Sequence, residues 1–146
     1  MLAVDTNVLV YAEIETSPFC ARARALLKRL SEGRGPWALP WPCLYEFLRV
    51  VTHPRVYRPP VPVDRARADL SMILASPSLV LLSQTERHAE ILQEVLAESG
   101  VAGNLVHDAH IVALCREHGV DELLTADRDF HRFRGLRIRN PFDPAD

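Results

Sequence analysis

The chain has 146 residues, a length that fits one folded domain with a single hydrophobic core. Its content of hydrophobic residues, 48%, is ordinary for a soluble globular protein and excludes a disordered chain. The formal net charge of −2 provides no general attraction to nucleic acid or to an anionic membrane. We therefore expect a single domain over residues 1–146 whose function depends on local sites.

The cysteines and the apolar runs indicate the cellular compartment of the protein. The three cysteines are far apart and form no Cys-x-x-Cys pair, which predicts neither a disulfide framework nor a zinc ribbon. That pattern favours the reducing cytoplasm. The apolar start is too short for a signal peptide and is interrupted by Asp5. No apolar run approaches the roughly 20 residues of a membrane-spanning helix, so we expect no membrane association.

The first ten residues contain two apolar runs separated by Asp5, Thr6 and Asn7. A short apolar run of this kind predicts a buried strand of a parallel sheet, with Asp5 at its carboxyl end. Open α/β sheets bind their ligands at that edge. A carboxylate there is costly unless a cation meets it. Residues 11–16 are expected to lead from this strand to the first helix.

The rest of the chain alternates between helical and strand patterns. Ser17 and Pro18 suit the start of a helix that ends near Gly33. Further helices are predicted at 44–51, 63–75, from Ser83 or Thr85 to 100, and 105–118, and strands at 37–39, 79–82, 123–125 and 136–138. The strand at 79–82 is expected to be buried and the last strand to lie at an edge. This alternation predicts a three-layer α/β/α domain with a central, mainly parallel sheet.

Residues 53–62 contain four prolines, so they cannot form a regular helix or a central strand. We expect a stiff loop that borders a substrate groove. The loop carries Arg55 and Arg58, and arginine is suited to bidentate contact with phosphate. A solvated arginine-rich surface is the alternative interpretation of this segment.

Four acids fall at the ends of predicted core elements. Asp5 ends the first strand, Glu46 lies on the helix at 44–51, Asp108 lies in the first turn of the helix at 105–118, and Asp127 follows the strand at 123–125. Any one of them alone is explained by a helix cap or a surface charge. Their common placement predicts that they converge. Carboxylates without thiolate or imidazole partners suit a hard cation such as Mg²⁺ or Mn²⁺.

The stretches that carry these acids resemble the PIN-domain ribonucleases, and within that group the VapC-type toxins of bacterial toxin–antitoxin pairs. The matching stretches are residues 4–9, the helix with Glu46, residues 104–109 with the apolar helix behind them, and residues 124–130. They occur in the family's order and cover nearly the whole chain. The resemblance implies a PIN-like fold. It implies that the catalytic acids are Asp5, Glu46, Asp108 and Asp127, that Asp5, Asp108 and Asp127 hold metal, and that Thr6, Asn7, Asn104, Thr125 and Asp129 support them.

The same resemblance implies a divalent-metal-dependent endoribonuclease, with one or two Mg²⁺ ions that Mn²⁺ can replace. The expected substrate is RNA in single-stranded or loop form, and the expected contacts to its phosphates come from Arg55 and Arg58. The resemblance further implies a homodimer and a cognate antitoxin protein that blocks the site. Composition and spacing indicate neither of these partners.

Asp127 and Asp129 compete for the role of metal ligand, because family members can carry acids at both positions. If the chain stays extended beyond Thr125, the side chains of Thr125 and Asp127 point the same way, toward Asp5. Phe130 and Phe133 are spaced for a helical turn that faces the core. We therefore assign Asp127 as the ligand, direct or through water, and Asp129 as the supporting acid.

The sequence gives less support to other functions. His107 and His110 flank Asp108, but no glutamate between them suits metalloprotease chemistry, so surface or supporting roles are favoured. A phosphatase or phosphotransferase that uses Asp5 as nucleophile would want a second aspartate two residues later, where Asn7 stands. A non-catalytic RNA- or protein-binding module gains no support from a sequence that keeps all four acids.

Overall fold

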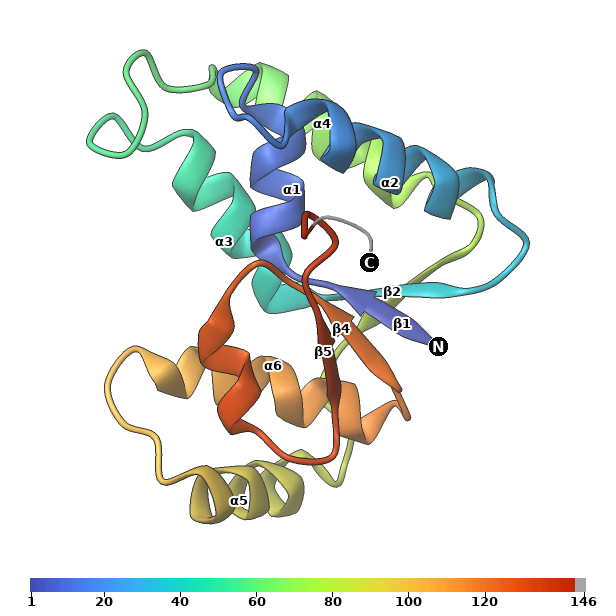
Figure 1. Cartoon of the computed structure of the whole chain (residues 1–146), viewed down its shortest axis with the longest axis vertical. Coiled ribbons are helices and arrows are strands. Elements are labelled where there is room, and N and C mark those ends of the chain that lie inside the picture. Colours follow the sequence, from blue (N-terminus) through green and yellow to red (C-terminus); the bar gives the residue numbers. More distant parts are fainter. Residues whose placement is uncertain (144–146) are drawn as a thin grey trace.

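The computed structural model of the chain describes residues 1–143, so residues 144–146 of the expected single domain lie outside the described part. Within the described residues, five parallel strands form one sheet in the order β3-β2-β1-β4-β5 (Figure 1). The strands are β1 (Leu2–Val4), β2 (Trp37–Pro40), β3 (Leu79–Leu82), β4 (Glu122–Leu124) and β5 (Arg137–Arg139). The expected parallel sheet and the edge position of the last strand are confirmed.

Helices cover both faces of this sheet, which confirms the three-layer α/β/α architecture (Figure 1). They are α1 (Thr6–Glu13), α2 (Cys20–Glu32), α3 (Trp41–Val51), α4 (Val63–Leu74), α5 (His88–Ser99), α6 (Leu105–Glu117) and the short 3-10 helix η1 (Arg128–Arg132). Side chains of a strand point alternately to its two faces. Ala3 and Leu123 accordingly pack in the core on the α5 and α6 side, whereas Val4 and Leu124 pack with α1 to α3.

Helix α1 was not predicted and corrects our interpretation of the N-terminus. The sheet strand ends at Val4, and the second apolar run belongs to a helix that begins at Thr6. Asp5 has extended backbone angles and its side chain accepts a hydrogen bond from the Thr6 amide, so it caps this helix. Val8 and Leu9 are fully buried in the helix. β-Branched residues in a short run favoured a strand, but the capping carboxylate and tertiary packing outweigh that local preference.

Three smaller expectations were wrong, two about where a helix begins and one about the burial of a strand. Helix α2 begins at Cys20, because the Ser17 hydroxyl accepts from the Phe19 amide in a turn that precedes the helix. Helix α5 begins only at His88, and the Thr85 hydroxyl instead accepts from the Arg87 amide. The strand β3 is not fully buried, because it lies at the sheet edge opposite β5.

The remaining elements agree with the sequence patterns. Residues 53–62 form an irregular loop, and the apolar run of α6 is buried. Phe130 and Phe133 are buried at the η1 turn, as their spacing predicted. No helix in the described part of the chain combines the length and apolar character needed to span a membrane. The carboxyl ends of β1 and β4 therefore lie side by side, where Val4 pairs with Leu124.

Candidate active site

Asp5 is the most firmly held acid of the site. It follows β1, is only 4% exposed, and accepts hydrogen bonds from the Thr6 amide at 2.7 Å, the Asn7 side-chain amide at 2.6 Å and the Thr125 hydroxyl at 2.7 Å. The Cys43 thiol lies at 3.7 Å from its Oδ1. A carboxylate has about four lone-pair positions, so roughly one remains for a metal ion or a water.

Asn7 and Thr125 join the end of β1 to the end of β4. The Asn7 amide nitrogen also donates to the Thr125 hydroxyl at 2.8 Å, and its oxygen accepts from the Ala126 amide at 3.0 Å. The Thr125 hydroxyl also accepts from the Asp127 amide at 3.0 Å. The network uses the full hydrogen-bonding capacity of the Thr125 hydroxyl, one donor and two acceptor positions. It fixes where Asp127 leaves the strand relative to Asp5.

Glu46 reaches the same site from α3. The Thr6 hydroxyl donates to its Oε2 at 2.9 Å, and Arg49, one turn further along α3, lies at 3.3 Å from its Oε1. Arg49 is a candidate for phosphate contact that the sequence interpretation missed. Its position three residues after Glu46 was the available signal, because residues at that spacing share a helix face.

One pocket of about 240 Å³ brings all four predicted acids together. Its lining includes Asp5, Glu46, Asp108 and Asp127, which come from four segments far apart in the sequence. Thr6 and Asn7 also line it, and Thr125 lies directly behind Asp5. As expected from the sequence, the four acids lie together at the carboxyl edge of the sheet.

Burial and mutual repulsion disfavour ionisation of two of these acids. Burial raises the pKa of Asp5 to about 6, against hydrogen bonds from Thr125 and Thr6 that lower it, and the negative charges of Glu46 and Asp127 add to the rise. Burial also raises the pKa of Asp108 to about 6, followed by the charges of Asp127 and Asp5. At neutral pH the site thus gathers carboxylates whose charges repel one another, a situation that a cation relieves.

The donor chemistry of the pocket fits Mg²⁺ or Mn²⁺. Among residues 1–143, no three acidic, imidazole or thiol groups come close enough together to enclose a metal ion as the side chains stand. Mg²⁺ does not need such a cage, because it usually keeps several waters and takes only one or two protein carboxylates. The available donors are carboxylate, amide and hydroxyl oxygens, which hard cations prefer.

Asp127 and Asp129 are placed differently. The Asp127 carboxylate accepts a hydrogen bond from the Asp129 amide at 2.8 Å and so caps η1. Asp127 also lines the small pocket. Asp129 is engaged by the Arg132 guanidinium at 2.6 Å and lines only the adjoining larger groove. Asn104 also lines that groove, and its side chain makes no capping hydrogen bond to α6.

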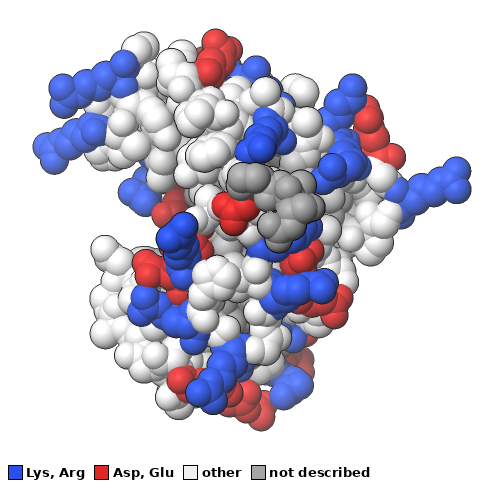
Figure 2. All heavy atoms as spheres, in the orientation of Figure 1, with Lys and Arg blue, Asp and Glu red and all other residues white. Residues whose placement is uncertain are grey.

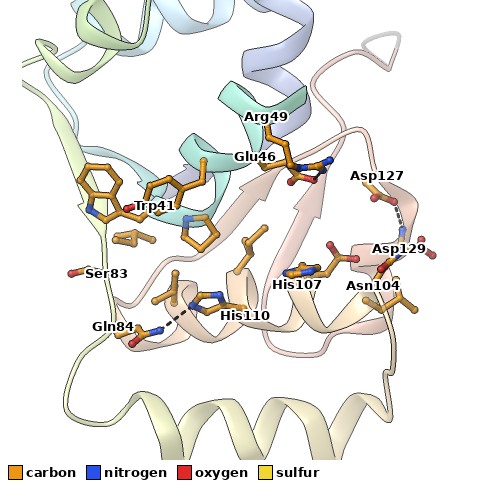
Figure 3. A pocket seen from close by; sticks show the side chains of 17 residues that line it. Trp41, Glu46, Arg49, Ser83, Gln84, Asn104, His107, His110, Asp127 and Asp129 are labelled. Atoms are coloured by element: carbon orange, nitrogen blue, oxygen red, sulfur yellow. Dashed lines mark hydrogen bonds and ion pairs between the residues drawn. The ribbon is translucent and has the colours of Figure 1, made fainter. Parts of the chain in front are cut away.

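The adjoining groove, about 1200 Å³ in volume, runs from the acids across α3 and α6 (Figure 3). In Figure 3, Asp127, Asp129 and Asn104 lie at one end, Trp41 and Gln84 at the other, and His110 between them. The sequence interpretation did not identify Trp41 or Gln84 as site residues. Gln84 could not have been identified locally, because only the sheet order places the end of β3 beside β2.

Arg55 and Arg58 are not brought to the acids. Both are exposed on the loop between α3 and α4, and neither is among the residues that line the two pockets. Figure 2 shows basic side chains that project from the corner of the molecule where this loop lies. Their contact with RNA stays a prediction.

The parallel sheet and the four acids at its carboxyl edge are the arrangement expected of a PIN-like protein. The chain belongs to the PIN domain family, whose family model matches residues 2–136. It is 37% identical over 138 residues to ribonuclease VapC48 of Mycobacterium tuberculosis, an alignment that covers 94% of this chain and 95% of that protein. It is 39% identical over 143 residues to ribonuclease VapC43 of the same species, with coverage of 98% and 97%.

The fold is also similar to that of a solved toxin–antitoxin complex from Klebsiella pneumoniae. The TM-score is 0.64 at 18% sequence identity, and the match covers 97% of this chain and 98% of that one. At this identity the likeness supports the fold alone. It agrees with the PIN-like arrangement expected from the sequence.

Proposed function

We propose that this protein is a divalent-metal-dependent endoribonuclease that hydrolyses RNA phosphodiester bonds. The observation that carries the proposal is the single pocket lined by Asp5, Glu46, Asp108 and Asp127. Relatives of nearly equal length and 37–39% identity are named ribonucleases, which supports RNA as the substrate. Clustered carboxylates of this kind are suited to metal-assisted phosphodiester hydrolysis.

In this proposal Asp5, Asp108 and Asp127 hold Mg²⁺, or Mn²⁺ in its place, directly or through water. Bound metal supplies a Lewis acid that lowers the pKa of water and stabilises charge on the phosphate. The protein supplies the fixed geometry. Thr6, Asn7 and Thr125 hold Asp5 by hydrogen bonds of 2.6–2.7 Å, so the acid does not reorganise during the reaction.

Glu46 and its neighbours act on the substrate side of the pocket. The Thr6 hydroxyl donates a hydrogen bond to Glu46, whose role in this proposal is to orient or deprotonate a water. Arg49, 64% exposed at the pocket rim, is free to move from Glu46 to a phosphate oxygen. The acids repel bare phosphate, so metal is needed for binding as well as for chemistry. The expected products carry 5′-phosphate and 3′-hydroxyl ends.

The surroundings of Asp5 argue against a covalent phosphatase or phosphotransferase mechanism. Three strong donors already occupy most of its lone pairs. Asn7, which stands where a second aspartate would act, donates one of these bonds. A carboxylate restrained and stabilised in this way is a poor nucleophile.

We further propose that the protein is the toxin of a toxin–antitoxin pair and that it acts in the cytoplasm as a homodimer. The relatives carry VapC names, and a protein of similar fold was solved in a complex described as toxin–antitoxin. The three cysteines are free and buried, which suits a reducing compartment. Co-expression with the product of the adjacent reading frame should restore growth to cells that this chain inhibits.

The test of the enzymatic proposal is cleavage of an end-labelled single-stranded RNA by the purified protein. We expect cleavage in Mg²⁺ or Mn²⁺, no cleavage in EDTA, and poor replacement by Zn²⁺, because the ligands are hard oxygens. The matched control is Asp64→Asn, an acid on α4 that is 96% exposed and is not among the residues that line either pocket. It should cleave as the wild type does, and full activity in EDTA would overturn the metal mechanism.

A further inference from the structure

The groove beside the acids has two chemically different ends. In Figure 3, Asp127 and Asp129 lie at the opposite end from Trp41 and Gln84. Tyr45, which also lines the groove, stacks on Trp41. At that end two aromatic rings and an amide replace charge. A phosphate belongs at the acidic end with its metal, whereas a neutral, flat and hydrogen-bonding group suits the other.

An aromatic surface is exposed where such a group would lie. Trp41 and Tyr45 are one helical turn apart on α3, and their rings stack with centroids 5.8 Å apart and planes 30° apart. Tyr45 is 66% exposed although it lines the groove. A stacked aromatic pair open to solvent offers a further stacking face to a nucleic acid base.

Hydrogen-bonding groups face this aromatic surface from the other wall. Gln84 Nε2 and His110 Nε2 lie 3.5 Å apart, and both side chains line the groove. His110 comes from α6 and Gln84 from the segment that follows β3. An amide and an imidazole can donate to and accept from the edge of a base.

The wall that carries these groups is held from behind by a buried acid. The side chain of Glu117 is fully buried and accepts from the Thr85 amide at 2.7 Å and the Thr85 hydroxyl at 2.8 Å. It also pairs with the His88 ring at 2.5 Å, and His88 packs edge-on against His110 with centroids 5.1 Å apart. Glu117 therefore holds Thr85, the residue next to Gln84, and also His88, whose ring packs against His110.

We propose that this end of the groove binds an unpaired RNA base beside the scissile phosphate, stacked on Tyr45 and hydrogen-bonded by Gln84 and His110. The inference rests on the proposed ribonuclease function and adds a base-binding subsite to it. Continuity with the acid pocket carries the choice of ligand, because Glu46, Asp108 and Asp127 line both cavities. Unpaired bases stacked on aromatic side chains are the usual basis of single-stranded RNA recognition.

Binding is tested separately from cleavage. Anisotropy of a fluorescent mixed-sequence single-stranded RNA is measured with Asp108→Asn and with the double variant Asp108→Asn/Tyr45→Ala, both in Mg²⁺. Asp108→Asn also removes one of the charges that repel phosphate, so this background should bind RNA even though it binds metal more weakly than the wild type does. Loss of one stacked base should weaken Kd about 10-fold. The conservative Tyr45→Phe in the same background should bind as tightly as Asp108→Asn alone, because the stacking face remains. Equal Kd values with Tyr45→Ala would overturn the proposal.

Cleavage then locates the subsite. In the otherwise wild-type enzyme, Tyr45→Ala should raise KM about 10-fold with little change in kcat. Gln84→Ala should relax base preference at one position beside the cut, and an abasic nucleotide there should abolish the effect of Tyr45→Ala. Met72→Ala, an exposed side chain on α4 outside both cavities, is the control and should change neither.

The remaining outcomes discriminate among explanations. If Tyr45→Ala converts a dimer to a monomer by light scattering and RNA binding falls only with it, the surface is a contact between copies of the chain and the base subsite is wrong. If Asp108→Asn cleaves like the wild type, the proposed active site fails instead. If cleavage depends on Asp108 but neither Kd nor KM responds to Tyr45→Ala, only the subsite is wrong.

Discussion

Asp5 and Asp108 contribute charge to the same pocket but are held in opposite ways. Asp5 accepts three strong hydrogen bonds, one of them from the Asn7 amide at 2.6 Å. The carboxylate of Asp108 makes no hydrogen bond or ion pair within residues 1–143. In an Asp5→Asn variant, the new side-chain NH₂ group could face the Asn7 NH₂ group, and two donors without an acceptor between them cost stability. Asp108→Asn is therefore the cleaner removal of a charge.

We predict that Asp108→Asn abolishes cleavage and raises the Tm of the metal-free protein at neutral pH. The folded-state pKa of Asp108, about 6, lies above its ordinary value of 3.8, so its ionisation costs folding stability at pH 7. After discounting for partial exposure, removing the charge should gain roughly 1 kcal/mol, or a few degrees in Tm.

The pH dependence of that gain provides the check. The cost of ionised Asp108 is fully present above its folded pKa and disappears as the pH falls from about 6 toward 3.8, where the wild-type group is protonated. The Tm difference between variant and wild type, measured in EDTA, should shrink over that interval. A difference that is constant from pH 7 to pH 4 would contradict the charge explanation.

Asp127 and Asp129 give a second prediction. Asp127→Asn should reduce cleavage about 100-fold or more at saturating Mg²⁺, in the range of losing a key electrostatic contact. Asp129→Asn should cost clearly less, because its carboxylate pairs with Arg132 at 2.6 Å and does not line the small pocket. A larger loss at Asp129 would reverse the assignment.

The expected extension beyond Thr125 explains part of this geometry. The Thr125 hydroxyl donates to Asp5, and Asp127 reaches the same pocket, as period-2 alternation predicted. The sequence did not reveal that Asp127 caps η1 through the Asp129 amide. Such a local bond depends on the backbone turn, which a pattern of alternating residues does not define.

At the scale of elements, the sequence predicted those whose signals are local and unopposed. The Pro-rich loop, the apolar α6 and the η1 turn all have such signals and are confirmed. Helix α1 has two competing signals, a β-branched apolar run and the Asp5 cap, and the wrong one was preferred. The cap lets a strand and a helix follow each other without a loop, which is how Asp5 and Thr6 both reach the site.

The loop between α3 and α4 gives the prediction at this scale. Arg55→Ala or Arg58→Ala should raise KM for RNA and flatten its dependence on salt, with little effect on the chemical step. Phosphate contacts position the substrate, and each one lost reduces the number of released counterions. Initial rates over a series of salt concentrations measure both effects. An unchanged KM and salt slope would leave this loop as a solvated surface, in keeping with the absence of Arg55 and Arg58 from the two pocket linings.

At the scale of the molecule, the sequence predicted that strands and helices alternate, but not which strands become neighbours. The order β3-β2-β1-β4-β5 places the chain's first strand at the centre and the ends of β1 and β4 side by side. That order creates the acid pocket and also brings Gln84 near His110. It is decided by packing between distant segments, so the acids could be listed from the sequence whereas the groove beside them could not.

The same topology predicts that metal binding stabilises the whole fold. The acids come from β1, α3, α6 and the turn after β4, so a cation in the pocket joins the two ends of the chain across the sheet. Mg²⁺ that binds only the folded state should raise Tm, by an amount that grows with its concentration. We expect a rise of a few degrees for the wild type in millimolar Mg²⁺, and a much smaller one for Asp108→Asn.

The surface variant Asp64→Asn should respond as the wild type does, because its carboxylate is 96% exposed on α4. Thermal unfolding followed by circular dichroism measures all three proteins without RNA, and equal shifts in wild type and Asp108→Asn would place the metal elsewhere.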